Sequence, residues 1–140
     1  MKVLLACEDF RVGGAQIFTL NLGKELEKGY DIILYSHYSQ YIDSELVMHH
    51  YPNAKIIYPN IYFDNYIRKI DKILYLLNID FSIREKIVAK HIQYVVRKYK
   101  IQIVHSNMFK SDYIFTKALD EKKIPILITM HGNYETFMDN

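Results

Sequence analysis

Short apolar segments of strand length alternate along this chain with longer segments of helical periodicity, and this order constrains the fold more than any other feature. Runs that are apolar at nearly every position are typical of strands buried on both faces of a sheet. Such strands, when separated by helices, favour a parallel sheet joined by right-handed crossovers. We therefore predict an α/β fold, a Rossmann-like doubly wound parallel sheet with helices on both faces.

The expected strands and helices cover most of the sequence. The strands are predicted over residues 2–7, 31–36, 54–58, 101–105 and 126–129. The helices are predicted over residues 15–28, 41–49, 61–77, 82–98 and 112–122. Ser82, followed three residues later by Glu85, matches a capping box at a helix start. With 140 residues, half of them apolar, the chain suits a single domain over residues 1–140.

Composition excludes several classes of protein. A net charge of +2 is too small to indicate a nucleic-acid binder. No apolar run is long enough to span a membrane, and the apolar start of the chain is too short for a secretory segment. Cys7 is the only cysteine, so it forms neither an internal disulfide nor a multi-thiolate metal site. We expect a cytoplasmic protein.

Positive charge gathers in one part of the sequence. Residues 61–100 hold nine Lys or Arg against four Asp or Glu, a local net charge of +5. A basic amphipathic helix can lie on an anionic membrane surface, but it can equally be a solvated face over an ordinary core. Peripheral contact with the inner face of a membrane, through the helices within 61–100, is one expectation that this segment leaves open.

Ligands of open α/β sheets bind outside the carboxyl ends of the strands, so the residues that follow each expected strand are candidates for a site. These residues are Glu8, Asp9, Gly13, Gly14, Ser36, His37, His105, Ser106, Asn107, His131 and Gly132.

Gly13 and Gly14 precede the first expected helix. Unpaired N–H groups and the helix dipole favour an anion at such a place, and glycine lets a ligand approach the backbone. The pair would also serve as a plain tight entry to the helix. It is neither the G-x-G-x-x-G dinucleotide fingerprint nor a P-loop.

Histidines follow two of the expected strands. His105 and His131 would lie at the same sheet edge, where an imidazole with a pKa near neutrality can bind or polarise a substrate. His105 could also serve only to cap its strand, whereas Gly132 beside His131 suggests close approach of a ligand, so His131 is the stronger candidate. His49 and His50 lack metal-ligand spacing, and no D-x-D triplet is present, so we expect no bound metal.

Three segments together resemble the N-terminal half of family 4 glycosyltransferases, which are retaining enzymes of the two-domain GT-B fold. The segments are 3–26 with VGGAQ ahead of a helix, 101–107 reading IQIVHSN, and 126–135 reading ILITMHGNYE. The family often has His-Ser-His where this sequence has His105-Ser106-Asn107. The family's Glu, seven residues, Glu motif lies in a second domain and has no counterpart here. The resemblance therefore implies an N-terminal, acceptor-binding domain without its C-terminal donor-binding domain.

The resemblance also implies an activity. The whole enzyme would transfer a sugar from a nucleoside-diphosphate sugar to a glycan or lipid-linked acceptor in surface polysaccharide or glycolipid synthesis, and residues 1–140 alone would be inactive. His131 would lie at the active centre, and Gly13 and Gly14 would contact the acceptor or the donor phosphate. His105 and Asn107 would line the acceptor side. Their place at the same edge adds two substrate-binding candidates, Asp9 and Gly132.

Two other functions fit the same residues. One is a noncatalytic Rossmann-like module that binds a nucleotide or phosphorylated ligand, or the subunit of a split transferase. The other is a small hydrolase or isomerase that uses Asp9, His105 and His131 for acid–base work. The absence of a G-x-S-x-G nucleophile elbow counts against an acyl hydrolase.

Overall fold

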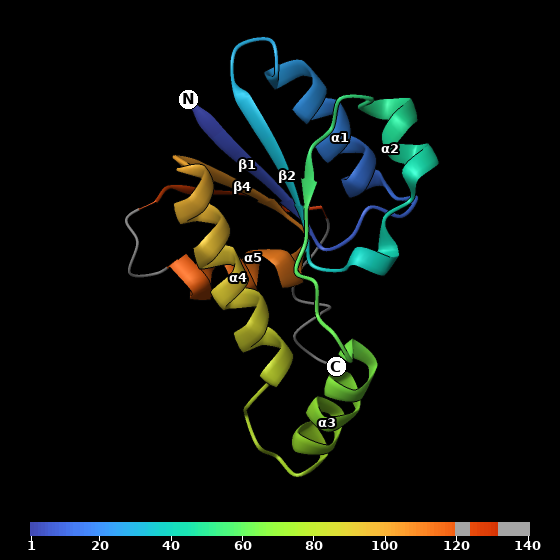
Figure 1. The fold of residues 1–140 in the computed structure, drawn as a ribbon, viewed down its shortest axis with the longest axis vertical. Coiled ribbons are helices and arrows are strands. Elements are labelled where there is room, and N and C mark those ends of the chain that lie inside the picture. Colours follow the sequence, from blue (N-terminus) through green and yellow to red (C-terminus); the bar gives the residue numbers. More distant parts are fainter. Residues whose placement is uncertain (120–123, 132–140) are drawn as a thin grey trace.

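The computed structural model describes residues 1–119 and 124–131. Its strands all run parallel in one sheet of order β3-β2-β1-β4-β5 (Figure 1). They are β1 Lys2–Cys7, β2 Asp31–Ser36, β3 Ile56–Ile57, β4 Ile103–Asn107 and β5 Ile126–Thr129. The predicted Rossmann-like α/β fold with a parallel sheet is confirmed.

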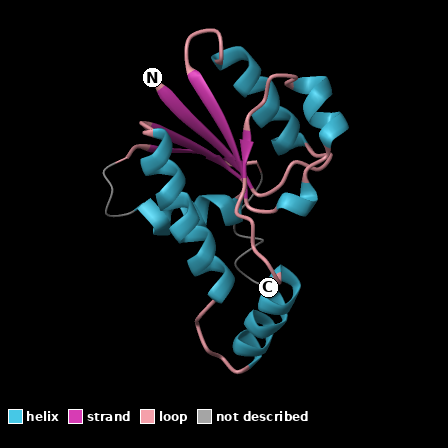
Figure 2. Cartoon of the chain, in the orientation of Figure 1, coloured by secondary structure: helices cyan, strands magenta, loops and turns pink. Residues whose placement is uncertain are grey.

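Helices cover both faces of this sheet (Figure 2). They are α1 Gly14–Leu26, α2 Ser44–His50, α3 Asp64–Leu76, α4 Ile83–Tyr99 and α5 Phe109–Leu119, with a short 3₁₀ turn at Ser39–Tyr41. The first two helices pack on one face, and α4 and α5 pack on the other. The third helix projects away from the sheet and touches mainly α4.

The central strand β1 explains why its sequence is apolar at each position from Val3 onward. Successive side chains of a strand point to opposite faces. Val3, Leu5 and Cys7 belong to the core beneath α1 and α2, whereas Leu4 and Ala6 belong to the core beneath α4 and α5. A strand with a helical layer on each side has no solvent face, so it tolerates no polar alternation.

Strand β4 is displaced by two residues from the predicted 101–105. Lys100 ends α4 in the left-handed region, with φ 54°, and Ile101 then donates its N–H to Val96 O, so the chain is still leaving the helix. At the other end Ser106 and Asn107 are polar but fully buried, and they pair with Ala6 and Cys7 of β1. The hydrophobic pattern stops at Val104, which is why the sequence placed the strand end too early.

Other boundaries differ for local reasons. Strand β3 is shorter than the predicted 54–58, because Ala54 N–H still bonds to Tyr51 O in the turn that follows α2. The predicted helix 41–49 divides at Asp43, whose carboxylate accepts the N–H groups of Glu45 and Leu46 at 3.0 and 3.1 Å. Helix α5 begins at Phe109, three residues before the predicted start.

His37, directly after β2, is enclosed in the core. Its Nε2 lies 3.1 Å from Ser111 Oγ. Burial, with a smaller effect from the positive charges of Arg84 and Lys110, lowers the pKa of His37 from 6.5 to about 3. The imidazole is therefore neutral in the folded protein at any pH near neutrality.

This shift predicts a loss of stability in mild acid. Below about pH 6.5 the unfolded chain takes up a proton at His37, while the folded chain does not until about pH 3, so the full stability is present above pH 6.5 and declines as the pH falls. We expect a lower melting temperature at about pH 5 than at about pH 7.5, and a smaller difference for His37→Gln. Thermal melts at the two pH values measure both. An equal pH dependence in the variant would contradict the assignment to His37.

Candidate functional site

The carboxyl ends of β1 and β4 form the switch point of the sheet. From β1 the strand order continues through β2 to β3 on one side, and from β4 to β5 on the other. Cys7, the last residue of β1, pairs in register with Asn107, the last residue of β4. Open α/β sheets leave a crevice for ligands at such a point. The loop from Glu8 to Gly13 borders it.

Asp9 holds the loop from Glu8 to Gly13 in place through hydrogen bonds. Its buried carboxylate accepts hydrogen bonds from Arg11 Nε at 3.0 Å, from the Arg11 backbone N–H at 3.2 Å and from Gln16 Nε2 at 3.0 Å. Burial by itself would raise the pKa of Asp9, but the hydrogen bonds from Arg11 and Gln16 outweigh it and hold the pKa below its usual value. Asp9 is thus an ionised residue whose oxygens are already engaged.

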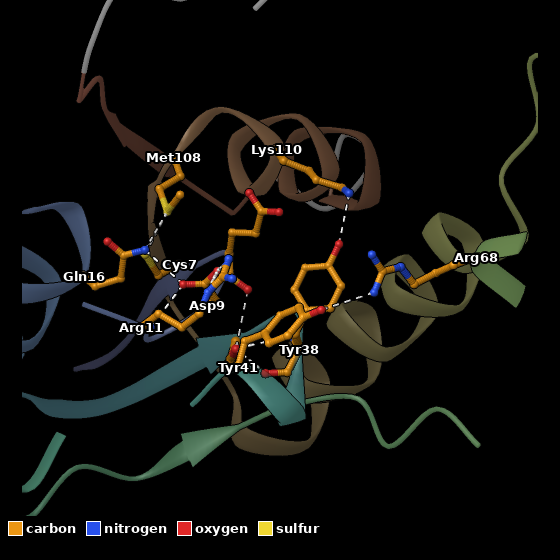
Figure 3. Close-up of polar contacts among 11 residues, drawn as sticks. Cys7, Asp9, Arg11, Gln16, Tyr38, Tyr41, Arg68, Met108 and Lys110 are labelled. Atoms are coloured by element: carbon orange, nitrogen blue, oxygen red, sulfur yellow. Dashed lines mark hydrogen bonds and ion pairs between the residues drawn. The ribbon is translucent and has the colours of Figure 1, made fainter. Parts of the chain in front are cut away.

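The same hydrogen bonds connect the loop to its neighbour across the switch point. Gln16 Nε2 lies 3.6 Å from Met108 Sδ, and Cys7 Sγ lies 3.4 Å from the same sulfur atom (Figure 3). Burial raises the pKa of Cys7 to about 12, so its thiol stays protonated and is no nucleophile at neutral pH. Cys7 and Met108 therefore contact each other at the carboxyl ends of β1 and β4.

Gly13 and Gly14 differ in what the protein requires of them. Gly13 is the N-cap residue of α1, with extended backbone and no side-chain cap. A Cβ atom on Gly13 would overlap the end of the Gln16 side chain, so any larger residue at this position must displace Gln16. A Cβ atom on Gly14 would meet nothing within 4 Å. The space in front of Gly14 is therefore open to a ligand.

His131 and Asn107 lie beside this helix entrance. His131 Nε2 is 3.2 Å from Asn107 Oδ1, and the exposed imidazole packs edge-on against Phe18, with 5.1 Å between ring centroids. Phe18 comes four residues after Gly14, so the two lie on the same side of α1. The structure thus places the His131 imidazole in contact with both Phe18, one helical turn after Gly14, and Asn107 at the end of β4.

His105 also lies near the Phe18 ring. It is half-buried in β4, its Nε2 lies 2.7 Å from Thr129 Oγ1, and its ring centroid is 6.5 Å from that of Phe18. Burial lowers the pKa of His105 further than the carboxylate of Asp112 raises it, so the ring is neutral. Its bond to β5 gives His105 a structural role in holding the strand that leads to His131. Gly132 lies outside the described residues.

Sequence reasoning missed a group of side chains beside the loop that follows β2. We call it the tyrosine–cation cluster, and its members are Tyr38, Tyr41, Arg11, Arg68, Arg84 and Lys110. The two tyrosine rings lie 5.3 Å apart. Arg11 lies over the ring of Tyr41 at 4.5 Å, and Arg84 lies over the ring of Tyr38 at 3.9 Å. The members of the cluster come from distant parts of the sequence, so no local motif indicates it.

The charges of the cluster are only partly balanced. Arg11 pairs with Asp9 and lies near Glu8, and Arg84 Nε pairs with Asp64 at 2.8 Å. Arg68 donates to the Tyr41 hydroxyl at 3.4 Å and Lys110 to the Tyr38 hydroxyl at 3.1 Å, both neutral acceptors (Figure 3). An anionic oxygen would be a stronger acceptor for these two donors.

The buried guanidinium of Arg84 is the inner part of this cluster. One nitrogen donates to the His37 carbonyl at 2.8 Å, while Nη1 has no hydrogen-bond partner among the described residues. Across residues 1–119 and 124–131, no group of three His, Cys, Asp or Glu side chains is arranged to hold a metal ion.

Comparison with protein-family models and with curated proteins gives no match for this chain. The resemblance of three segments to family 4 glycosyltransferases therefore stays a prediction. What the structure adds is their arrangement: β1 with the start of α1, β4, and β5 with His131 lie next to one another at one sheet edge.

The two glycines give a testable difference in stability. Gly13→Ala should force Gln16 away from Asp9 and destabilise the fold by about 1 kcal/mol or more. Gly14→Ala should be neutral or stabilising by about 0.5 kcal/mol, since its site is open and alanine reduces the entropy of the unfolded chain. Urea unfolding of both variants measures the difference. Equal destabilisation by both would show that Gly14 is required by the fold.

Proposed function

We propose that this chain is the N-terminal, acceptor-binding domain of a retaining glycosyltransferase of the GT-B type. The whole enzyme would transfer a sugar from a nucleoside-diphosphate sugar to a glycan or lipid-linked acceptor. One observation carries the proposal: the exposed His131 imidazole contacts both the Asn107 amide and Phe18, which lies one helical turn after the open position at Gly14. These groups belong to the three segments that resemble the family.

Each group has a role in this proposal. The intrahelical bonds of α1 begin with Ile17 N–H to Gly13 O, and the N–H groups ahead of Ile17 would stabilise negative charge that develops on the leaving diphosphate. His131 donates from Nε2 to Asn107 Oδ1, which leaves Nδ1 as an acceptor for a sugar hydroxyl. Asn107 would thereby hold the imidazole in one tautomer and orientation.

The remaining catalytic groups would come from a donor-binding domain, in the same polypeptide or in a second one. The domain described here would position the acceptor, an effect that matters only when donor and acceptor are held together. Residues 1–140 by themselves should therefore show negligible transfer.

The tyrosine–cation cluster favours a second candidate, a module that binds a phosphorylated ligand without chemistry. Arg68 and Lys110 approach the same pair of tyrosine rings and donate to neutral hydroxyls. A hydrolase or isomerase has less support. Asp9 bonds Arg11 and Gln16, whereas the two histidines bond Thr129 and Asn107, so these residues form no acid–base relay.

The transferase proposal predicts a selective effect of one histidine. In the enzyme that carries both domains, His131→Ala should lower kcat by about tenfold or more, because the sugar loses an oriented hydrogen-bond partner. The melting temperature should stay unchanged, since His131 is exposed. His49→Ala removes another exposed histidine, from α2, and serves as the control. Equal rates for the wild type and His131→Ala would remove His131 from the active centre.

The second candidate predicts phosphate binding by this chain alone. Titration calorimetry with inorganic pyrophosphate should detect binding, and Arg68→Gln with Lys110→Gln should weaken it by about tenfold or more, because charge-assisted bonds are lost. The same two changes at Lys24 and Lys28, which are exposed at the end of α1, are the control. Failure of the wild type to bind pyrophosphate would contradict this second function. It would not affect the transferase proposal, which His131→Ala tests.

A further inference from the structure

Helix α3 buries none of its residues, although it is strongly amphipathic. One of its faces is directed toward the body of the protein by charged contacts. Asp71 accepts hydrogen bonds from Ser82 Oγ and the Ile83 N–H, both at 2.8 Å, and so caps the start of α4. Asp64 pairs with the buried Arg84 on the same side. The half-buried positions of α3 all lie on this face: Asp64, Ile67, Asp71 and Leu74.

The apolar face of α3 points elsewhere. Tyr66, Ile70, Ile73 and Leu77 follow one another at helical spacing and are 65%, 45%, 55% and 64% exposed. We call these four residues the α3 stripe. An apolar stripe of this kind normally faces the core. Here the polar contacts to α4 turn it to solvent.

Exposed apolar side chains continue at both ends of the stripe. Residues 62–81 hold ten of the 22 exposed large hydrophobic residues found in the described part of the chain. Tyr62 and Phe63 precede α3, and Ile79 and Phe81 follow it, all of them exposed. Figures 1 and 2 show this segment projecting from the sheet as a helix and turn. Large exposed apolar patches on soluble domains mark contact with a protein or a membrane.

Lysines border this apolar surface. Lys69 and Lys72 are exposed on α3, and Lys69 Nζ lies 5.7 Å from the centre of the Tyr66 ring. Lys86, on the first turn of α4, lies 4.2 Å from the Phe81 ring centre. Of the three acids in residues 62–81, Asp64 and Asp71 face the body, whereas Asp80 is exposed in the turn after α3. The projecting surface is therefore apolar and aromatic at its centre and basic at its side.

We propose that the α3 stripe inserts into the interface of an anionic lipid bilayer. Tyrosine and phenylalanine suit the boundary between headgroups and acyl chains, and the ammonium groups of Lys69, Lys72 and Lys86 reach lipid phosphates. The surface projects, so it suits a bilayer plane better than a groove that would enclose a partner helix. This inference is independent of glycosyl transfer.

The sequence left membrane contact open for all helices within residues 61–100. The proposal concerns only α3 and the turn after it. Helix α4 uses its apolar residues Val88, Ile92 and Val95 for the core beneath the sheet. Its remaining lysines lie on an ordinary solvated helix. In the described residues no helix is long and apolar enough to cross a bilayer, so the proposed contact is with the surface.

Vesicle cosedimentation tests the inference. The chain should bind vesicles that contain phosphatidylserine about tenfold more strongly than vesicles of phosphatidylcholine alone, and added salt should weaken the binding. Tyr66→Ser with Ile73→Ser should reduce binding by about tenfold. Tyr94→Ser with Ile128→Ser removes two comparably exposed residues from α4 and β5 and should change nothing. Circular dichroism shows that each variant remains folded.

Two charge-reversal variants distinguish a role of the α3 lysines from an effect of the net charge of the protein. Lys69→Glu with Lys72→Glu should abolish the preference for anionic vesicles, whereas Lys24→Glu with Lys28→Glu, the same change of net charge at the far end of α1, should not. Equal binding by the stripe variant and wild type would overturn the inference. So would a wild type that ignores vesicles but forms dimers that the stripe variant does not, since a second copy would then cover the stripe.

Discussion

Burial of β1 on both faces is the constraint on which the rest of the structure depends. Leu4 and Leu5 point to opposite helical layers and are both fully buried. Burying a side chain of this size contributes roughly 1.5–3 kcal/mol. Because β1 is central, β2 pairs with one of its edges and β4 with the other, so the sheet extends from β1 in two opposite directions. The switch point follows from that arrangement, and with it the contact between Asn107 and His131 beside α1.

Polar contacts hold the loops at the carboxyl edge of the sheet in place. Asp9 restrains the β1–α1 loop through Arg11 and Gln16, and Arg84 connects Asp64 of α3 to the carbonyl of His37 after β2. Such buried charges require partners, so their geometry is specific. Loss of one partner should therefore disturb the edge more than the core.

The two proposed surfaces meet at α3. Arg68 projects from this helix to Tyr41 in the tyrosine–cation cluster, while the α3 stripe faces away from α4. A domain resting on a bilayer through α3 would bring the cluster close to the lipid headgroups. That placement is compatible with an acceptor that carries both a lipid chain and a phosphate group.

The amino-acid sequence by itself determined the layered α/β fold and the bounds of β1, β2 and β5, because unbroken apolar runs and local caps such as Ser82 depend only on nearby residues. It also indicated that His131 and Asn107 lie at the same edge of the sheet. Only the tertiary structure decided that β4 includes Asn107, that Asp9 is engaged by Arg11, and that the apolar stripe of α3 faces solvent. Each depends on side chains or strands brought together by folding. The tyrosine–cation cluster is the clearest case, since Arg11 and Lys110 lie about a hundred residues apart in the chain and reach the neighbouring rings of Tyr41 and Tyr38 only in the folded protein.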